Sequence, residues 1–168
     1  MAAGPPSTAL SLALPDEAST LRAGASLGAA LRPGMVVTLA GDLGAGKTTF
    51  ARGVLRGLGW TGPVKSPTFA LVEHYPLSNL YLYHFDFYRL EDPSEWDDAG
   101  MADSFRDDST CLVEWPERVA SRLPRADVAI VLAHPVPGSA GRHLDATATT
   151  EAGKRCLTAL ARGMDATR

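Results

Sequence analysis

Cysteine is scarce in this chain of 168 residues, which contains only Cys111 and Cys156. The two thiols lie far apart in the sequence, form no metal-binding spacing, and are too few to staple a fold of this size. A disulfide-rich scaffold and a cysteine-held zinc site are therefore excluded. We expect both cysteines to be small core residues of a cytoplasmic protein.

Long apolar runs and an excess of positive charge are also missing. No stretch approaches the ~18 apolar residues of a membrane span, and residues 1–14 lack the Lys or Arg that begins a signal peptide. Sixteen Lys and Arg against 19 Asp and Glu give a net charge of -3. The chain as a whole therefore offers no electrostatic footprint for nucleic acid or for an anionic membrane. We expect a cytoplasmic protein without membrane contact.

What the sequence does contain is the composition of one globular domain. Hydrophobic residues make up 45% and charged residues 21%, which is ordinary for a folded domain, and the length corresponds to roughly one domain. The Ala, Gly and Pro residues at the start cannot bury much surface, so residues 1–8 are predicted to be a disordered tail. Residues 9–163 are predicted to form a single domain.

Short apolar runs alternate with segments of helical periodicity, a pattern typical of an α/β fold. Helices are predicted after Asp16, after Lys47, after Pro116 and over residues 151–162. Residues 90–108 hold eight Asp or Glu and predict short helices around Trp96 and Phe105. Strands are predicted at residues 9–14, 35–40, 68–75, 80–87, 110–113, 128–133 and 143–148, with 68–75 and 80–87 forming an antiparallel hairpin.

A phosphate-binding motif follows the predicted strand 35–40. Residues 41–48 satisfy the P-loop pattern G-x-x-x-x-G-K-[ST] at a strand-to-helix transition, the context that this motif requires. Its glycines let successive backbone N–H groups point inward, and the following helix adds the positive end of its dipole. Lys47 brings a charge to the β- and γ-phosphates, and the Thr48 hydroxyl can bind Mg²⁺. The candidate nucleotide-binding residues are Gly41, Asp42, Leu43, Gly44, Ala45, Gly46, Lys47, Thr48 and Thr49.

Two acids stand where a P-loop protein needs a carboxylate beside its metal. Asp86 ends one predicted strand and Glu114 ends another, so each is expected at the carboxyl edge of the sheet, where open α/β sheets bind ligands. Taken singly, either acid could instead be a cap or part of a surface ion pair. Their joint placement at strand ends favours a role in the site.

Other polar residues crowd Asp86. On an extended strand His84, Asp86 and Tyr88 share one face. His84 is more typical of a hydrogen-bonded core histidine than of a catalytic base. Arg89 could bind a phosphate or pair with one of the acids in residues 90–108. These alternatives stay open at the level of sequence.

Four motifs in register resemble one known family. In chain order they are Gly41 to Phe50, Ser66-Pro67-Thr68-Phe69, His84 to Arg89 and Glu114-Trp115-Pro116. Together they resemble the TsaE family, the P-loop ATPase of bacterial tRNA threonylcarbamoyladenosine biosynthesis. The resemblance covers about residues 9–160.

The resemblance implies a fold and an activity. The fold is a P-loop NTPase domain with a mostly parallel sheet flanked by helices. The activity is a Mg²⁺-dependent ATPase that is weak alone and resets the complex of TsaB and TsaD between catalytic cycles. The resemblance also implies that ATP and Mg²⁺ are the cofactors, that TsaB and TsaD are the protein partners, and that tRNA is met indirectly through the complex.

The resemblance also assigns residue roles. Thr48 and Glu114 are expected to bind Mg²⁺, whereas Lys47 and Asp86 are the candidate catalytic residues, Asp86 by positioning or deprotonating the attacking water. Trp115 and Arg142 are expected near the nucleotide, although Arg142 fits a surface ion pair equally well. The candidate switch loop, which would sense the nucleotide, is Ser66, Pro67, Thr68 and Phe69.

Two other functions use the same motifs. A small-molecule kinase shares the P-loop but needs an acceptor pocket and an arginine-bearing lid, whereas the one arginine cluster here, Arg118, Arg122 and Arg125, is typical of a solvated helix face. A non-catalytic assembly module would bind Mg²⁺ and ATP without activating a water. Asp86 is the residue that argues against this second alternative. Which of Asp86 and Glu114 positions the water is left open by the sequence.

Overall fold

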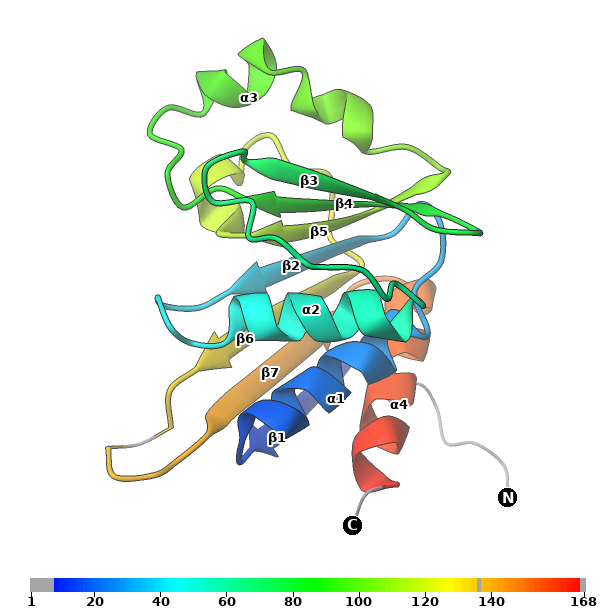
Figure 1. The fold of residues 1–168 in the computed structure, drawn as a ribbon, viewed down its shortest axis with the longest axis vertical. Helices are drawn as coiled ribbons and strands as arrows, with labels where there is room; N and C mark the ends of the chain where they lie inside the picture. Colours follow the sequence, from blue (N-terminus) through cyan, green and yellow to red (C-terminus); the bar gives the residue numbers. More distant parts are fainter. Residues whose placement is uncertain (1–7, 136, 167–168) are drawn as a thin grey trace.

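The computed structural model describes residues 8–135 and 137–166. Within them seven strands form one sheet in the order β1-β7-β6-β2-β5-β4-β3, and helices flank it (Figure 1). The expected tail, residues 1–8, lies outside the described residues except for Thr8, whose carbonyl accepts a hydrogen bond from Ala148 N. The α/β class expected from the sequence is confirmed.

The elements follow the order expected from the apolar pattern. The strands are β1 (Ala9–Leu14), β2 (Val36–Ala40), β3 (Val72–Pro76), β4 (Tyr81–Asp86), β5 (Ser109–Glu114), β6 (Val128–Ala133) and β7 (Arg142–Ala148). The helices are α1 (Glu17–Gly28), α2 (Lys47–Gly57), α3 (Ser94–Asp98) and α4 (Glu151–Asp165), with short 3-10 helices η1 (Met101–Ser104) and η2 (Pro116–Val119).

The sheet is mixed, with the expected parallel strands at its centre. Strands β6, β2, β5 and β4 pair in parallel at its centre, whereas β1, β7 and β3 pair antiparallel at its flanks. The parallel centre sets the register of the two acids singled out in the sequence, because Asp86 lies opposite Glu114 and Leu39 lies opposite Glu114 on the other side. Paired residues share a face, so both carboxylates lie on one side of the sheet at its carboxyl edge.

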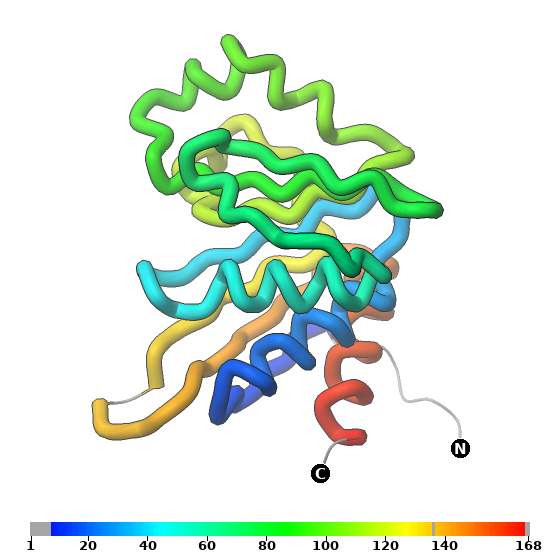
Figure 2. The backbone as a smooth tube through the Cα atoms, viewed as in Figure 1, coloured from blue at the N-terminus to red at the C-terminus, as the bar shows by residue number. Residues whose placement is uncertain are grey.

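Two apolar clusters pack against the sheet, one on each face. One packs α1, α2 and α4 against residues such as Leu39, Leu82 and Leu112. The other packs α3, η1 and η2 against Phe85 and Val113. Figure 2 shows the same division along the backbone, with α1, α2 and α4 on one side and the 90–108 segment at the far edge. Asp86 and Glu114 belong to the α1–α2 face, since they alternate with Phe85 and Val113.

Helix α2, which carries the P-loop lysine, is fixed by an unusually close approach to α1. A Cβ added to Gly24 of α1 would stand 2.3 Å from Phe50 O, and one added to Gly53 of α2 would stand 2.4 Å from Leu21 O. Only glycine allows the two backbones to come this near. The pair therefore sets the position of the first turn of α2, which opens on the site.

The largest error of the sequence prediction concerns residues 68–71. The aromatic and β-branched pattern predicts a strand from Thr68, but β3 begins at Val72. Leu71 N donates to Pro67 O at 2.7 Å, and Leu71 adopts a left-handed backbone with φ of 67°. These residues form a turn instead, which places the Thr68 hydroxyl within hydrogen-bond distance of Asp86. The strand prediction was wrong there because this turn and its hydrogen bonds outweigh the strand propensity of the residues.

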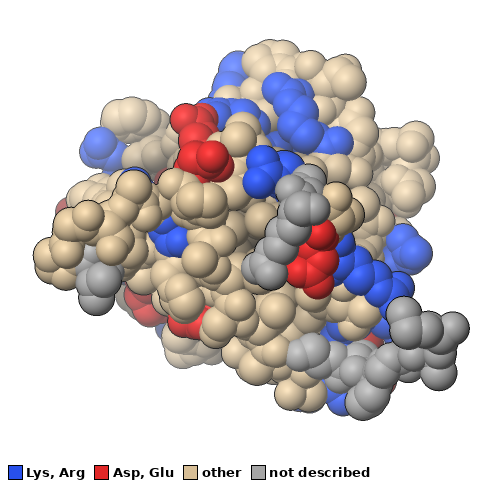
Figure 3. Space-filling model, turned by 90° about the horizontal axis from the view of Figure 1, so that it is seen from below, with Lys and Arg blue, Asp and Glu red and all other residues tan. Residues whose placement is uncertain are grey.

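Figure 3 views the molecule from below, over the end that carries α4 and β1. Lys and Arg side chains form separate groups on this face, with Asp, Glu and uncharged surface between them. In the parts of the chain that the structure describes, no helix is both long and apolar enough to cross a membrane.

Candidate functional site

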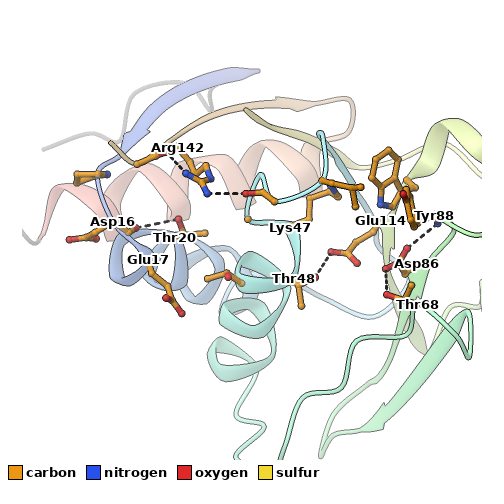
Figure 4. Close-up of a pocket in the computed structure, with 17 residues that line it drawn as sticks. Asp16, Glu17, Thr20, Lys47, Thr48, Thr68, Asp86, Tyr88, Glu114 and Arg142 are labelled. Atoms are coloured by element: carbon orange, nitrogen blue, oxygen red, sulfur yellow. Dashed lines mark hydrogen bonds between the residues drawn. The ribbon is translucent and has the colours of Figure 1, made fainter. Parts of the chain in front are cut away.

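A cleft of about 540 Å³ opens at the carboxyl edge of the parallel strands (Figure 4). Its walls come from five places: the P-loop with the start of α2, the loop that carries Thr68, the ends of β4 and β5, the start of α1, and the start of β7. Residues lining it include Asp16, Thr20, Gly44, Lys47, Thr48, Thr68, Asp86, Tyr88, Glu114, Trp115 and Arg142.

The P-loop adopts a conformation suited to anions. Gly41, Gly44 and Gly46 have φ angles of 144°, 77° and 102°, values that residues with a side chain rarely adopt. Gly46 is the N-cap of α2 and supplies no side-chain cap, so amide groups of the first turn remain available to a ligand. The helix start and its dipole together form a site for phosphate.

Lys47 is held inside this loop. Lys47 is 6% exposed, and its ammonium group donates hydrogen bonds to the carbonyls of Gly41 and Asp42. The same nitrogen lies 4.3 Å from the ring centroid of Trp115. Burial lowers the pKa of Lys47, while the nearby carboxylates, Glu114 foremost, act in the opposite direction. A phosphate in the cleft would give this buried charge the anionic partner that favours it.

Thr48 and Glu114 meet across the cleft floor. Thr48 Oγ1 lies 3.4 Å from Glu114 Oε1, and Glu114 is 1% exposed. The second carboxylate oxygen, Oε2, is buried and has no hydrogen-bond partner among the described residues. Thr48 Oγ1 and Glu114 Oε1 are a hydroxyl and a carboxylate oxygen that face each other, and such oxygen donors are of the kind that Mg²⁺ prefers. This pair therefore fits a magnesium ion.

The candidate magnesium site has two protein ligands, Thr48 and Glu114. Within residues 8–135 and 137–166, no group of three or more His, Cys, Asp or Glu is placed to hold a metal. Magnesium in phosphoryl-transfer sites commonly uses one or two protein ligands, with water and phosphate oxygens completing its shell. Thr48 and Glu114 would suffice for such a site.

Asp86 organises the opposite wall. Its Oδ1 accepts a hydrogen bond from Tyr88 N at 3.0 Å, and its Oδ2 accepts one from Thr68 Oγ1 at 3.1 Å. Thr68 Oγ1 in turn lies 2.7 Å from Ser66 Oγ. The Asp86 carboxylate is thus the point through which the expected switch loop, residues 66–69, joins the cleft.

Two expected nucleotide residues lie at the cleft mouth. Trp115 follows β5 in a left-handed backbone conformation with φ of 58°, and its ring lies 5.0 Å from that of Tyr88 between centroids. Arg142, which opens β7, donates from Nη2 to Gly44 O at 2.9 Å and so fastens β7 to the P-loop. The alternative left open by the sequence, a surface ion pair, is not formed with any of the described residues, where both hydrogen bonds of the Arg142 side chain go to carbonyl oxygens.

Some candidate residues do not line the cleft. Ala45 is fully buried beneath the loop, and neither it nor Asp42 is among the lining residues. Phe69 is 83% exposed and carries the guanidinium of Arg89 over its ring at 4.2 Å. Arg89 therefore stacks on the loop that the sequence predicts to be a switch.

The start of α1 is the part of the cleft that sequence reasoning missed. Asp16 accepts a hydrogen bond from Ser19 N at 2.7 Å, forming a capping box, and this bond lowers the pKa of its carboxyl group. The sequence predicts a helix after Asp16 but gives no sign that Asp16, Glu17 and Thr20 would line a cleft with the P-loop. Only the packing of α1 against α2 brings them there.

Comparisons with known proteins agree on one family. The family model described as threonylcarbamoyl adenosine biosynthesis protein TsaE matches residues 14–142. A Haemophilus influenzae protein named tRNA threonylcarbamoyladenosine biosynthesis protein TsaE is 42% identical over 151 residues, covering 87% of this chain and 94% of the relative. A Bacillus subtilis protein of the same name is 48% identical over 101 residues, covering 60% of this chain and 63% of the relative.

A solved structure has the same fold. The crystal structure of Bacillus subtilis YdiB superposes with a TM-score of 0.72 at 35% sequence identity, covering 92% of this chain and 95% of that chain. The matched family region, residues 14–142, includes the P-loop, residues 66–69 and both strand-end acids.

Proposed function

The chain belongs to the TsaE family of threonylcarbamoyl adenosine biosynthesis proteins, and from this membership we propose that it serves tRNA threonylcarbamoyladenosine biosynthesis as a Mg²⁺-dependent ATPase. The observation that carries the proposal is the convergence of Lys47, Thr48, Asp86 and Glu114 on one cleft. A phosphate cradle, a pair of oxygen donors for magnesium and a second carboxylate, that of Asp86, are the parts of a nucleotide-hydrolysing site.

The P-loop would bind the phosphates of the nucleotide. The amides of residues 41–48 would surround the phosphates, and the Lys47 ammonium would exchange its carbonyl partners for phosphate oxygens. Thr48 and Glu114 would hold Mg²⁺, which when bound neutralises charge on the β- and γ-phosphate oxygens. Trp115 and Arg142 would lie beside the nucleotide at the mouth of the cleft.

Asp86 would activate the attacking water. Its carboxylate is 5% exposed and lines the cleft, with both oxygens already held by Tyr88 N and Thr68 Oγ1. Such a fixed acceptor would orient a water toward the γ-phosphorus, so that the O–H proton leaves toward the carboxylate as the water oxygen attacks. ATP and water then give ADP and inorganic phosphate. Glu114 is left to the metal because it adjoins Thr48.

The biological use of this turnover is taken from the family. We infer that the chain is a weak ATPase alone, that TsaB and TsaD stimulate it in the cytoplasm, and that hydrolysis resets their complex between modification cycles. The chain meets tRNA only through that complex, in keeping with its net charge of -3.

Phosphate release from ATP tests the proposal directly. Release is measured with Mg²⁺ and with EDTA, for the chain alone and with TsaB and TsaD, and Lys47→Ala serves as the negative control. We expect slow Mg²⁺-dependent release alone and a faster rate with the partners.

Two outcomes would contradict it. ATP binding without release in either condition would leave an assembly module that uses nucleotide only to stabilise an interface. Transfer of the γ-phosphate to an added nucleoside or metabolite, in place of free phosphate, would identify a kinase.

A further inference from the structure

His84 is the most deeply buried titratable side chain of the site that the proposed mechanism does not use. It lies on β4, two residues before Asp86, and is 0% exposed. Neither Nδ1 nor Nε2 has a hydrogen-bond partner among the described residues. An imidazole sealed away from water normally has at least one such partner, because an unsatisfied buried polar group destabilises the fold.

The neighbour of this imidazole is the magnesium-side carboxylate. His84 Nε2 lies 3.5 Å from Glu114 Oε2, and Oε2 is the other orphaned buried atom of this pair. Beside an ionised carboxylate the favoured tautomer of His84 carries its proton on Nε2, since two lone pairs would repel each other. The distance is slightly longer than a good hydrogen bond, as is common for catalytic contacts before the substrate is loaded.

The two oxygens of Glu114 thus have different neighbours. Oε1 lies 3.4 Å from Thr48 Oγ1 at the cleft floor, while Oε2 is turned into the protein toward His84. A contact at Oε2 fixes the rotation of the carboxylate about its last bond, and that rotation decides where Oε1 points. Groups that hold a metal ligand in this way commonly change metal affinity or activity by 10- to 100-fold when removed.

We propose that His84 is a positioning residue, whose Nε2–H holds Glu114 so that Oε1 faces Thr48 and the magnesium position. This inference rests on the proposed function for the identity of the metal. His84 itself touches neither the nucleotide nor the attacking water in this arrangement. It acts only through Glu114.

The test compares the Mg²⁺ dependence of ADP binding in three variants with that of the wild-type chain. His84→Phe keeps a ring but removes both nitrogens, His84→Gln keeps an N–H donor, and Leu82→Ala is a matched control two residues earlier on the same face of β4. MgCl₂ is titrated into the chain with ADP, binding is followed by calorimetry, and affinity in EDTA is recorded separately.

We expect His84→Phe to raise the Mg²⁺ concentration at half-effect by about tenfold or more, while ADP affinity in EDTA stays within about twofold. His84→Gln should restore most of the Mg²⁺ response. Leu82→Ala should lower the melting temperature but leave the Mg²⁺ response unchanged. Wild-type Mg²⁺ dependence in a folded His84→Phe chain would overturn the inference and leave His84 as a core histidine.

A second measurement covers the case in which His84→Phe fails to fold. His84→Leu, which introduces a smaller apolar side chain, is then used in place of His84→Phe. The apolar variant that folds is also combined with Glu114→Gln. If His84 acts through Glu114, its substitution has no further effect on Mg²⁺ dependence in that background. An effect of equal size in both backgrounds would contradict the positioning role.

Binding and turnover separate this inference from the proposed function. A chain that binds ADP with a His84-dependent Mg²⁺ response but releases no phosphate would support the inference and refute the ATPase. A chain that hydrolyses ATP with the same Mg²⁺ response in His84→Phe would do the reverse.

Discussion

The P-loop lines the cleft with Gly44, Gly46 and the buried Lys47, and its glycines adopt positive-φ conformations. The loop of residues 66–71 instead meets the cleft through one side chain, that of Thr68. The first wall is closely packed: a Cβ on Gly41 would stand 2.3 Å from Leu132 O, and Arg142 fastens Gly44. The second wall exposes Phe69 and is joined to the site by hydroxyl bonds that end on Asp86. One wall is thus preformed for phosphate, and the other is held by the carboxylate that we assign to the water.

The largest expected effect is on the preformed wall. Lys47→Ala should lower phosphate release by about 1000-fold, as expected when a donor to the developing charge is lost, and should abolish the stabilisation of the fold by ATP. For the wild-type chain, ATP at 100 times its Kd raises the free energy of unfolding by about 2.7 kcal/mol. Thermal melts with and without ATP measure this.

The control is Lys65→Ala, which removes an exposed lysine outside the cleft. A full response of Lys47→Ala to ATP would refute the phosphate site.

The packing of the same wall is tested by two glycine variants. Gly41→Ala should reduce the free energy of unfolding by about 3 kcal/mol, because the added Cβ meets Leu132 O and φ of 144° is nearly exclusive to glycine. A Cβ added at Gly44 has no neighbour within 4 Å, so Gly44→Ala carries only the backbone strain of φ at 77°. We expect it to reduce the free energy of unfolding by about 1 kcal/mol. Urea unfolding without nucleotide gives both values. Equal losses would mean that the wall is not built around the contact with Leu132.

The carboxylate that joins the two walls should separate binding from turnover. Asp86→Asn is expected to lower phosphate release by about 100-fold, the contribution of a general base, while ATP affinity stays within about threefold because the P-loop is unchanged. Single-turnover kinetics and calorimetry measure the two quantities. Retained turnover would mean that Glu114, and not Asp86, positions the attacking water.

The same contrast explains what the sequence could predict. The P-loop is a local motif whose glycines and lysine act within nine residues, so its strand-loop-helix context follows from the pattern alone. The positions of Asp86 and Glu114 at strand ends also followed, because each acid directly succeeds an apolar run. The structure confirms both placements.

The other wall depends on contacts that the sequence does not display. Residues 68–71 have strand propensity, but the bond of Thr68 to Asp86 and the turn at Leu71 overrule it. The approach of α1, which adds Asp16 to the cleft, depends on glycines that are far apart in the chain. The facing of His84 and Glu114 arises from register between two strands. Such long-range pairings are decided by packing, and local patterns carry little information about them.

The smallest expected effect concerns the hydroxyl that ties the 66–71 loop to the site. Thr68→Val removes the donor to Asp86 Oδ2 but keeps the shape of the side chain, so one charge-assisted hydrogen bond is lost, worth about 1.5 kcal/mol. Part of that loss is recovered because water can reach the half-buried position, and we expect a turnover about fivefold lower with ATP affinity unchanged. Thr68→Ser keeps the hydroxyl and should behave as the wild-type chain does. If Thr68→Val instead weakened ATP binding and left turnover intact, the loop would be part of the binding wall, and the division of labour between the two walls would be wrong.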